Sequence, residues 1–266
     1  MDVVNILTFV VVALYMGGAI AVFSRLFHPE GPNPKVYLSF GSLAILSHSV
    51  LLSKNIFFQH TIDLSLINVI SLVAFIITFS VTFIAIRFKA NLIVTVTYGF
   101  AALLLSSLAF VPENQHMTID VNKVNLVTHI SLALLSYAIL VIATLYALQV
   151  KYINHKLKSK NISAINNFPP LMQVEGQLFK IMLAGTICLL ISQVVGLLFI
   201  DGFFGSENLH KTILSFIALV IYVLILLGHY RLGWRGHRVL ILSLVATTLL
   251  TLSYFGSRFV KEFLLS

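Results

Sequence analysis

Charged residues are scarce in this chain, and their scarcity excludes a soluble globular protein. They make up 10% of the 266 residues, whereas a soluble domain has roughly 25%. The mean hydropathy is +1.00. A membrane-spanning helix needs about 20 mostly apolar residues. Eight runs come close to this length, at 3–25, 36–53, 65–87, 91–111, 127–150, 177–200, 211–229 and 238–259. We therefore predict an all-α, polytopic membrane bundle of eight transmembrane helices.

Other absences exclude further classes of protein. The apolar runs do not alternate with polar residues, which excludes a closed β-barrel. A single cysteine, Cys188, allows neither an internal disulfide nor a cysteine metal cage. The first residues lack the features of a cleaved signal, so the first run is expected to remain as a helix. The chain has no phosphate-binding glycine loop, HExxH helix or paired intramembrane carboxylates, and we expect no enzyme activity.

The loops predict one integral membrane domain over 1–266 with two halves. Four helices lie within 1–111, and a polar loop separates them from four more within 127–266. The longest connection, 151–176, is too short to bury a core of its own. It ends in two prolines followed by Glu175, a conventional helix start in which the carboxylate complements the helix dipole.

Lysine and arginine are distributed unequally between alternate loops, which predicts the orientation. Eleven lie in the first, third, fifth and seventh loops: Arg25, Lys35, Arg87, Lys89, Lys151, Lys156, Lys158, Lys160, Arg231, Arg235 and Arg238. Five lie in the other loops and at the carboxyl end: Lys54, Lys123, Lys211, Arg258 and Lys261. This bias predicts that both termini are outside, on the side of the membrane away from the cytoplasm. The net charge of +8 then reflects contact with anionic membrane lipid, and no nucleic-acid partner is needed.

Against this apolar background, four histidines stand out: His48, His129, His210 and His229. An ionisable ring inside a membrane is costly unless it has a partner. Neutral imidazole is also the commonest protein ligand for a metal, including the iron of haem. Each of these histidines is therefore a candidate ligand, and for each a purely structural role is the alternative.

His129 lies at the predicted outer start of the fifth helix. At helical spacing it shares a face with Ala133, Ser136 and Tyr137. Small residues beside a histidine leave room for a flat ligand, and Tyr137 would line its pocket. The alternative is a histidine packed against small residues at a helix contact.

His210 opens the seventh helix at the outer face and is either a ligand or a boundary residue. Nearby Lys211 and Arg258 could pair with a carboxylate of a bound cofactor, or could extend to the lipid headgroups. His48 lies about 9 Å below the outer end of the second helix, as a ligand or bonded to a neighbouring serine. His229 ends the seventh helix, about 28 Å from His210, so these two cannot share a metal.

Several segments resemble the cytochrome c assembly family of haem-handling membrane proteins (CcmC-, CcsA- and HemX-type). The histidine-bearing segment 127–138 and the segments 209–215 and 227–229 are similar to blocks of that family. Segments 47–48, 64–69, 169–172, 233–236 and 254–258 are similar to its YpjD-like inner-membrane branch. The resemblance covers nearly the whole chain.

The resemblance implies haem binding or haem passage, with histidines as axial ligands. His129 matches the outward-facing ligands of the family, and His48 and His229 match those within the membrane. The chain departs from the family between its sixth and seventh helices, where Phe203 and Phe204 replace a tryptophan-rich segment. Its only tryptophan, Trp234, lies on the opposite side, and no histidine follows the eighth helix. The resemblance therefore supports haem binding more than direct delivery to apocytochrome c.

We thus expect a haem b site in the outer half of the bilayer. His129 is the leading ligand, with His48 or His210 opposite it, and these three form the predicted metal-ligand set. Partners would be haem, membrane lipid and a haem-accepting or other membrane protein. The alternative is a haem-free scaffold or accessory subunit with structural histidines, whose basic loop at 151–160 binds a cytosolic partner or anionic lipid. A transporter is disfavoured because mid-membrane charges are missing.

Overall fold

The computed structural model describes most of the chain, and the structural statements below concern that part. The described residues are 3–26, 28, 30–58, 61–88, 90–108, 118–120, 123–160, 168–200, 203–205 and 209–256.

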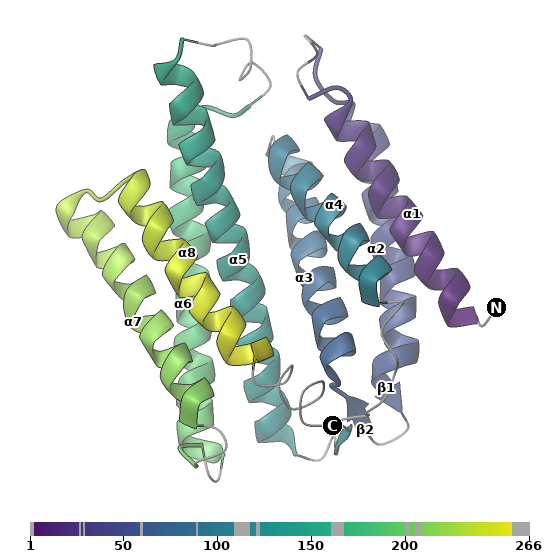
Figure 1. The fold of residues 1–266 in the computed structure, drawn as a ribbon, viewed down its shortest axis with the longest axis vertical. Helices are drawn as coiled ribbons and strands as arrows, with labels where there is room; N and C mark the ends of the chain where they lie inside the picture. The colour runs from purple at the N-terminus through teal and green to yellow at the C-terminus, as the bar shows by residue number, and fades with distance from the viewer. Residues whose placement is uncertain are drawn as a thin grey trace. The chain divides into compact units, whose positions relative to one another are not determined.

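The described residues form eight α-helices, as the apolar runs predict (Figure 1). They are α1 (Val3–Phe23), α2 (Pro34–Ile56), α3 (Leu66–Arg87), α4 (Asn91–Leu108), α5 (Val124–Lys158), α6 (Leu171–Phe199), α7 (Leu209–Leu232) and α8 (His237–Thr251), which continues as the π-helical turn η2 (Leu252–Gly256). Among the described residues, Pro32, Pro169 and Pro170 lie between helices, and Pro34 occupies the first helical position, where a missing N–H costs nothing.

Seven of the described helices are long and apolar enough to cross a membrane. The other, α4, has 18 residues and extends about 27 Å, which is slightly less than a typical hydrocarbon core. The prediction of a polytopic helical membrane protein is therefore confirmed. Seven of the eight predicted spans meet the length and composition expected of a spanning helix.

The boundaries differ from the prediction in the connection after the fifth run. Helices α5 and α6 extend well into 151–176, because lysine, glutamine and glutamate favour helix once the chain has left the apolar run. The structure also contains three short strands where loops were expected: β1 (Phe57–Phe58), β2 (Thr61–Asp63) and β3 (Thr118–Asp120), in the sheet order β1-β2-β3. Strands β1 and β2 form an antiparallel hairpin in which Phe57 pairs with Ile62.

The chain divides into two compact units. Unit 1 comprises Met1–Thr118 and Tyr152–Gln173, and unit 2 comprises Ile119–Lys151 and Val174–Ser266. In unit 1, α1 lies beside α2 and α4, and α3 lies beside the same two helices (Figure 1). The ring of Tyr98 fits against Gly18, where a Cβ would lie 2.8 Å from it. Glycine there lets α1 and α4 approach closely.

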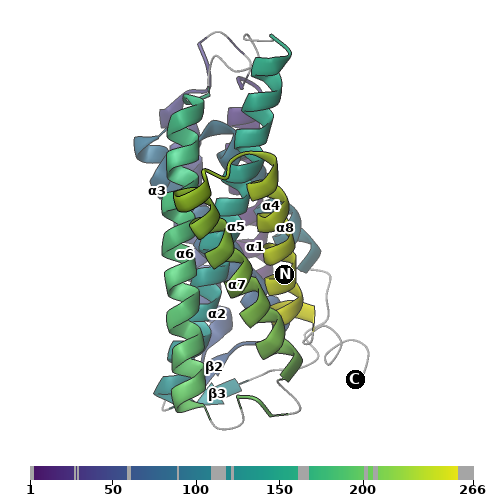
Figure 2. The same cartoon turned by 90° about the vertical axis from the view of Figure 1, so that its left-hand side faces the viewer.

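In unit 2, hydrogen bonds from side chains to the backbone connect α5 and α6, and α7 and α8 lie side by side (Figure 2). The hydroxyl of Ser136 donates to the carbonyl of Gly185 at 3.1 Å. The tight turn between α7 and α8 contains Gly233 and Gly236, with φ of +65° and +64°. Only glycine adopts this backbone readily, so these two residues permit the tight reversal between α7 and α8.

Candidate functional site

His129 lies in the first turns of α5 and is held by α6. Its Nδ1 is 2.7 Å from the backbone carbonyl of Ser192, and the Ser192 hydroxyl donates to the His129 carbonyl at 3.1 Å. A carbonyl oxygen can only accept, so the Nδ1 atom must carry the proton. The lone pair of the neutral ring therefore lies on Nε2, which has no hydrogen-bond partner within the described ranges.

This is the arrangement that a metal-ligating histidine requires. One ring nitrogen donates to a backbone carbonyl, which sets the ring orientation and the tautomer, and the other is left to coordinate. The ring is partly exposed rather than enclosed. His129 therefore lies near the start of α5, and its Nε2 atom is left without a hydrogen bond among the described residues.

Two residues that the sequence analysis did not assign to the site complete the surroundings of His129. The Phe203 ring meets the imidazole edge-on, with centroids 5.7 Å apart. Gly196 lies beneath both rings: a Cβ there would be 2.9 Å from Cε1 of His129 and closer still to Phe203. Ser192 and Gly196 are four residues apart on α6, a small-residue spacing that indicates a close helix contact.

Tyr137 is buried two turns further along α5 and contacts a different helix. Its hydroxyl is 2.9 Å from Oγ1 of Thr251 on α8, and its ring meets those of Tyr254 and Phe255. The hydroxyl of Tyr254 is buried and has no hydrogen-bond partner in the described part of the chain. Tyr254 belongs to η2, and π-helical turns are frequent at functional sites. Its hydroxyl is a polar group near Tyr137 that the sequence did not predict.

His210 is exposed at the start of α7. Phe203 connects this end of α7 to His129. Its carbonyl accepts a hydrogen bond from the Thr212 hydroxyl at 3.0 Å, and its ring contacts the His129 ring. The backbone carbonyl of the neighbouring Lys211 accepts a hydrogen bond from Ser253 at 2.8 Å. Arg258, the other predicted cation, lies outside the described residues.

His229 has a similar arrangement at the other end of α7. Its Nδ1 donates to the backbone carbonyl of Trp234 at 3.0 Å, and its ring stacks on Phe179 with centroids 3.3 Å apart. Close by, Arg235 forms an ion pair with the nearly buried Glu175 at 3.5 Å. Glu175 therefore has a partner beyond the helix dipole, and this pair connects α6 to the α7–α8 turn.

His48 is completely buried in unit 1, and both of its ring nitrogens have partners. Nδ1 lies 3.2 Å from the hydroxyl of Tyr15, and Nε2 lies 3.1 Å from the hydroxyl of Ser71. Tyr15 is also 2.8 Å from Oγ1 of Thr78. Three helices thus meet at one imidazole, and neither nitrogen is open to a ligand in this arrangement.

The structure brings the surroundings of His129 close to the start of α7, and it encloses His48 within unit 1. In the described part of the chain, no group of three or more histidine, cysteine, aspartate or glutamate side chains could hold a metal ion. Haem iron needs only one or two axial ligands from the protein, which is a smaller requirement.

Sequence comparison adds an independent observation. Residues 37–265 match the cytochrome c assembly protein family. The chain belongs to this family. It is 37% identical to the inner membrane protein YpjD of Escherichia coli K12 over 222 residues, which cover 83% of this chain and 84% of YpjD. It is 28% identical to protein HemX of Brevibacillus brevis over 163 residues, covering 59% of each chain.

A further relative is an uncharacterized 28.8 kDa protein of Azospirillum brasilense, 32% identical over 140 residues, which cover 52% of each chain. No solved structure matches the chain. The family membership and the resemblance to the YpjD-like branch predicted from sequence are confirmed. With its seven apolar helices, this member of the family is a multi-pass inner-membrane protein.

Proposed function

We propose that this member of the cytochrome c assembly family binds haem b, with His129 as an axial ligand. The observation that carries the proposal is the bond from Nδ1 of His129 to the Ser192 carbonyl, which directs the Nε2 lone pair away from the protein backbone. Family membership supports haem as the group that this nitrogen would hold. The role needs no general base, because binding, orienting and releasing a cofactor involves no catalysis.

His210 is the best candidate for the opposing ligand. It is exposed at the start of α7, and Phe203 connects this end of α7 to the His129 ring. Phe203 and Phe204 would provide an apolar contact surface for a porphyrin in place of tryptophans. Lys211 and Arg258 remain the proposed partners for the propionates.

His229 is proposed as a separate ligand position at the other end of unit 2. Its Nδ1 proton also goes to a carbonyl, which leaves Nε2 to coordinate. Because its ring is stacked on Phe179, a haem there would have to approach the free nitrogen along the ring plane. His210 and His229 lie at opposite ends of α7, and ligand positions at these two ends are suited to moving a haem across the membrane.

One observation favours a second candidate, a haem-free scaffold with structural histidines. His48 fits that interpretation, since both of its nitrogens are bonded to hydroxyl groups inside unit 1. The two functions make different predictions for the purified protein, because a haem protein is coloured and a scaffold is colourless.

The test is an optical spectrum of the protein purified from haem-replete membranes, oxidised and then dithionite-reduced, with a pyridine haemochrome assay. We expect a Soret band and sharp reduced α and β bands. His129→Ala should weaken haem affinity by at least about tenfold and so lower haem occupancy, since losing even an orienting bond costs about 10–100-fold in metal affinity. His155→Ala is the matched control, because His155 is exposed on the same helix, near its other end. A colourless wild-type protein that stays colourless with added haemin would favour the scaffold.

A further inference from the structure

Unit 1 contains a pocket of about 230 Å³ that is separate from the histidines. It lies between the α1–α2 turn and the α3–α4 turn, at the end of the unit where α2 and α4 begin. Because the apolar helices end at this level, the pocket lies at the depth of the lipid headgroups.

The inner wall of the pocket is suited to an anion. Arg87 lines it with a positively charged side chain, and the amino termini of α2 and α4, at Pro34 and Asn91, contribute partial positive charge. Tyr37 also lines the pocket, and only 3% of its surface is exposed. The structure gives the Tyr37 hydroxyl no hydrogen bond among the residues that it describes, so this hydroxyl can donate to a ligand in the pocket.

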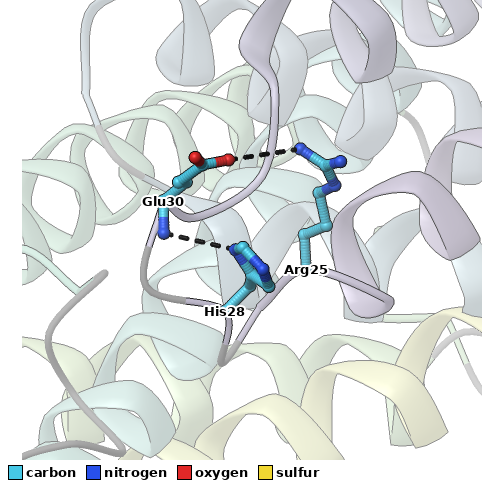
Figure 3. Close-up of polar contacts among 3 residues, drawn as sticks. All are labelled: Arg25, His28 and Glu30. Atoms are coloured by element: carbon cyan, nitrogen blue, oxygen red, sulfur yellow. Dashed lines mark hydrogen bonds and ion pairs between the residues drawn. The ribbon is translucent and has the colours of Figure 1, made fainter.

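The α1–α2 turn forms the other wall and contains the only carboxylate among the described residues that line the pocket, Glu30. Arg25 lies 3.9 Å from this carboxylate, and the backbone N–H of Glu30 donates to Nδ1 of His28 at 3.3 Å (Figure 3). Both charged side chains of this pair are more than half exposed, so its main effect is to offset the negative charge near the pocket.

The rim of the pocket is apolar and exposed, which indicates an amphiphile rather than a free ion. Ile86 and Phe88 line the pocket, and 63% and 40% of their surfaces are exposed. Ile86 lies in the last turn of α3, and Phe88 follows the end of that helix. A ligand that matches both parts has a phosphate group joined to acyl chains.

We propose that this pocket binds the phosphate headgroup of an anionic phospholipid, with Arg87 and Tyr37 contacting the phosphate. The predicted orientation places this end of unit 1 in the cytoplasmic leaflet, where anionic lipids attract basic residues. The proposal is independent of haem.

The test is native mass spectrometry of the full chain in neutral detergent, titrated with short-chain phosphatidylglycerol and, separately, phosphatidylcholine. We expect tighter binding of the first lipid to one saturable site. Arg87→Gln should weaken this binding about fivefold, as expected for one arginine near a membrane surface. Tyr37→Phe, which keeps the ring, should weaken it about threefold. Arg231→Gln is the control, because Arg231 is an exposed arginine in unit 2 and does not line the pocket.

The source of the phosphate is tested by competition. Added sodium phosphate, compared with sodium chloride at equal ionic strength, should leave the bound lipid in place. Displacement of the lipid by phosphate alone would overturn the proposal in favour of a free-phosphate site. Equal binding of both lipids, or wild-type binding of phosphatidylglycerol by both pocket variants, would also overturn it.

Discussion

Replacing His48 by alanine separates the structural role of this residue from the ligand role that sequence also allowed. In the structure its ring connects the hydroxyl of Tyr15 on α1 to that of Ser71 on α3. The imidazole is completely buried, so removing the ring takes both bonds away from hydroxyls in the interior of unit 1.

The expected loss of stability follows from the two bonds and the space left behind. Hydrogen bonds between membrane helices contribute about 0.6 kcal/mol on average and at most about 1.7 kcal/mol each. The cavity adds to this loss, because the surrounding helices relax only partly. We expect His48→Ala to lower the free energy of unfolding by about 2–4 kcal/mol. Tyr15→Phe removes one bond and should lower it by about 0.6–1.7 kcal/mol.

Unfolding is measured by circular dichroism as the fraction of denaturing detergent is raised, and haem occupancy is measured on the same samples while they are folded. Ser49→Ala is the control, because that exposed hydroxyl donates to the Leu46 carbonyl of its own helix. We expect His48→Ala to keep the haem occupancy of the wild type. Unchanged stability together with lost haem would show that His48 is a ligand and would refute the structural reasoning.

Three further predictions test other parts of the molecule. Gly196→Ala should lower haem occupancy, because the added Cβ would displace the rings of His129 and Phe203. Gly176→Ala on the same helix is the control, because a Cβ there meets open space and should leave occupancy unchanged. Equal effects of the two substitutions would contradict the proposed site. Glu175→Gln should lower stability by up to about 1 kcal/mol at low salt and by less at high salt, as measured by thermal unfolding, since its partner Arg235 is largely exposed. A reporter enzyme active only in the periplasm should be active when fused to the carboxyl terminus; activity of a cytoplasmic reporter there would contradict the predicted orientation.

Sequence alone was sufficient for the membrane class, the helices and the family. A chain this poor in charge must bury its backbone polar groups within helices, so the apolar runs predict where helices form. The segment around His129 also identified the residue on which the proposed site depends. In contrast, helix ends beyond the apolar runs could not be predicted well, because polar residues such as those after Lys151 can continue a helix or leave it.

Only the tertiary structure separated the histidines from one another. His48 and His129 look alike in sequence, since each lies in an apolar helix near small or hydroxyl residues. In the fold, the hydroxyls of Tyr15 and Ser71 bond to both nitrogens of His48, whereas the Ser192 carbonyl bonds to one nitrogen of His129 and the other has no partner among the described residues. The partners lie between 23 and 63 residues away along the chain, and no local pattern records them. The availability of a lone pair depends on which helices meet at the ring, which is a property of the packed fold.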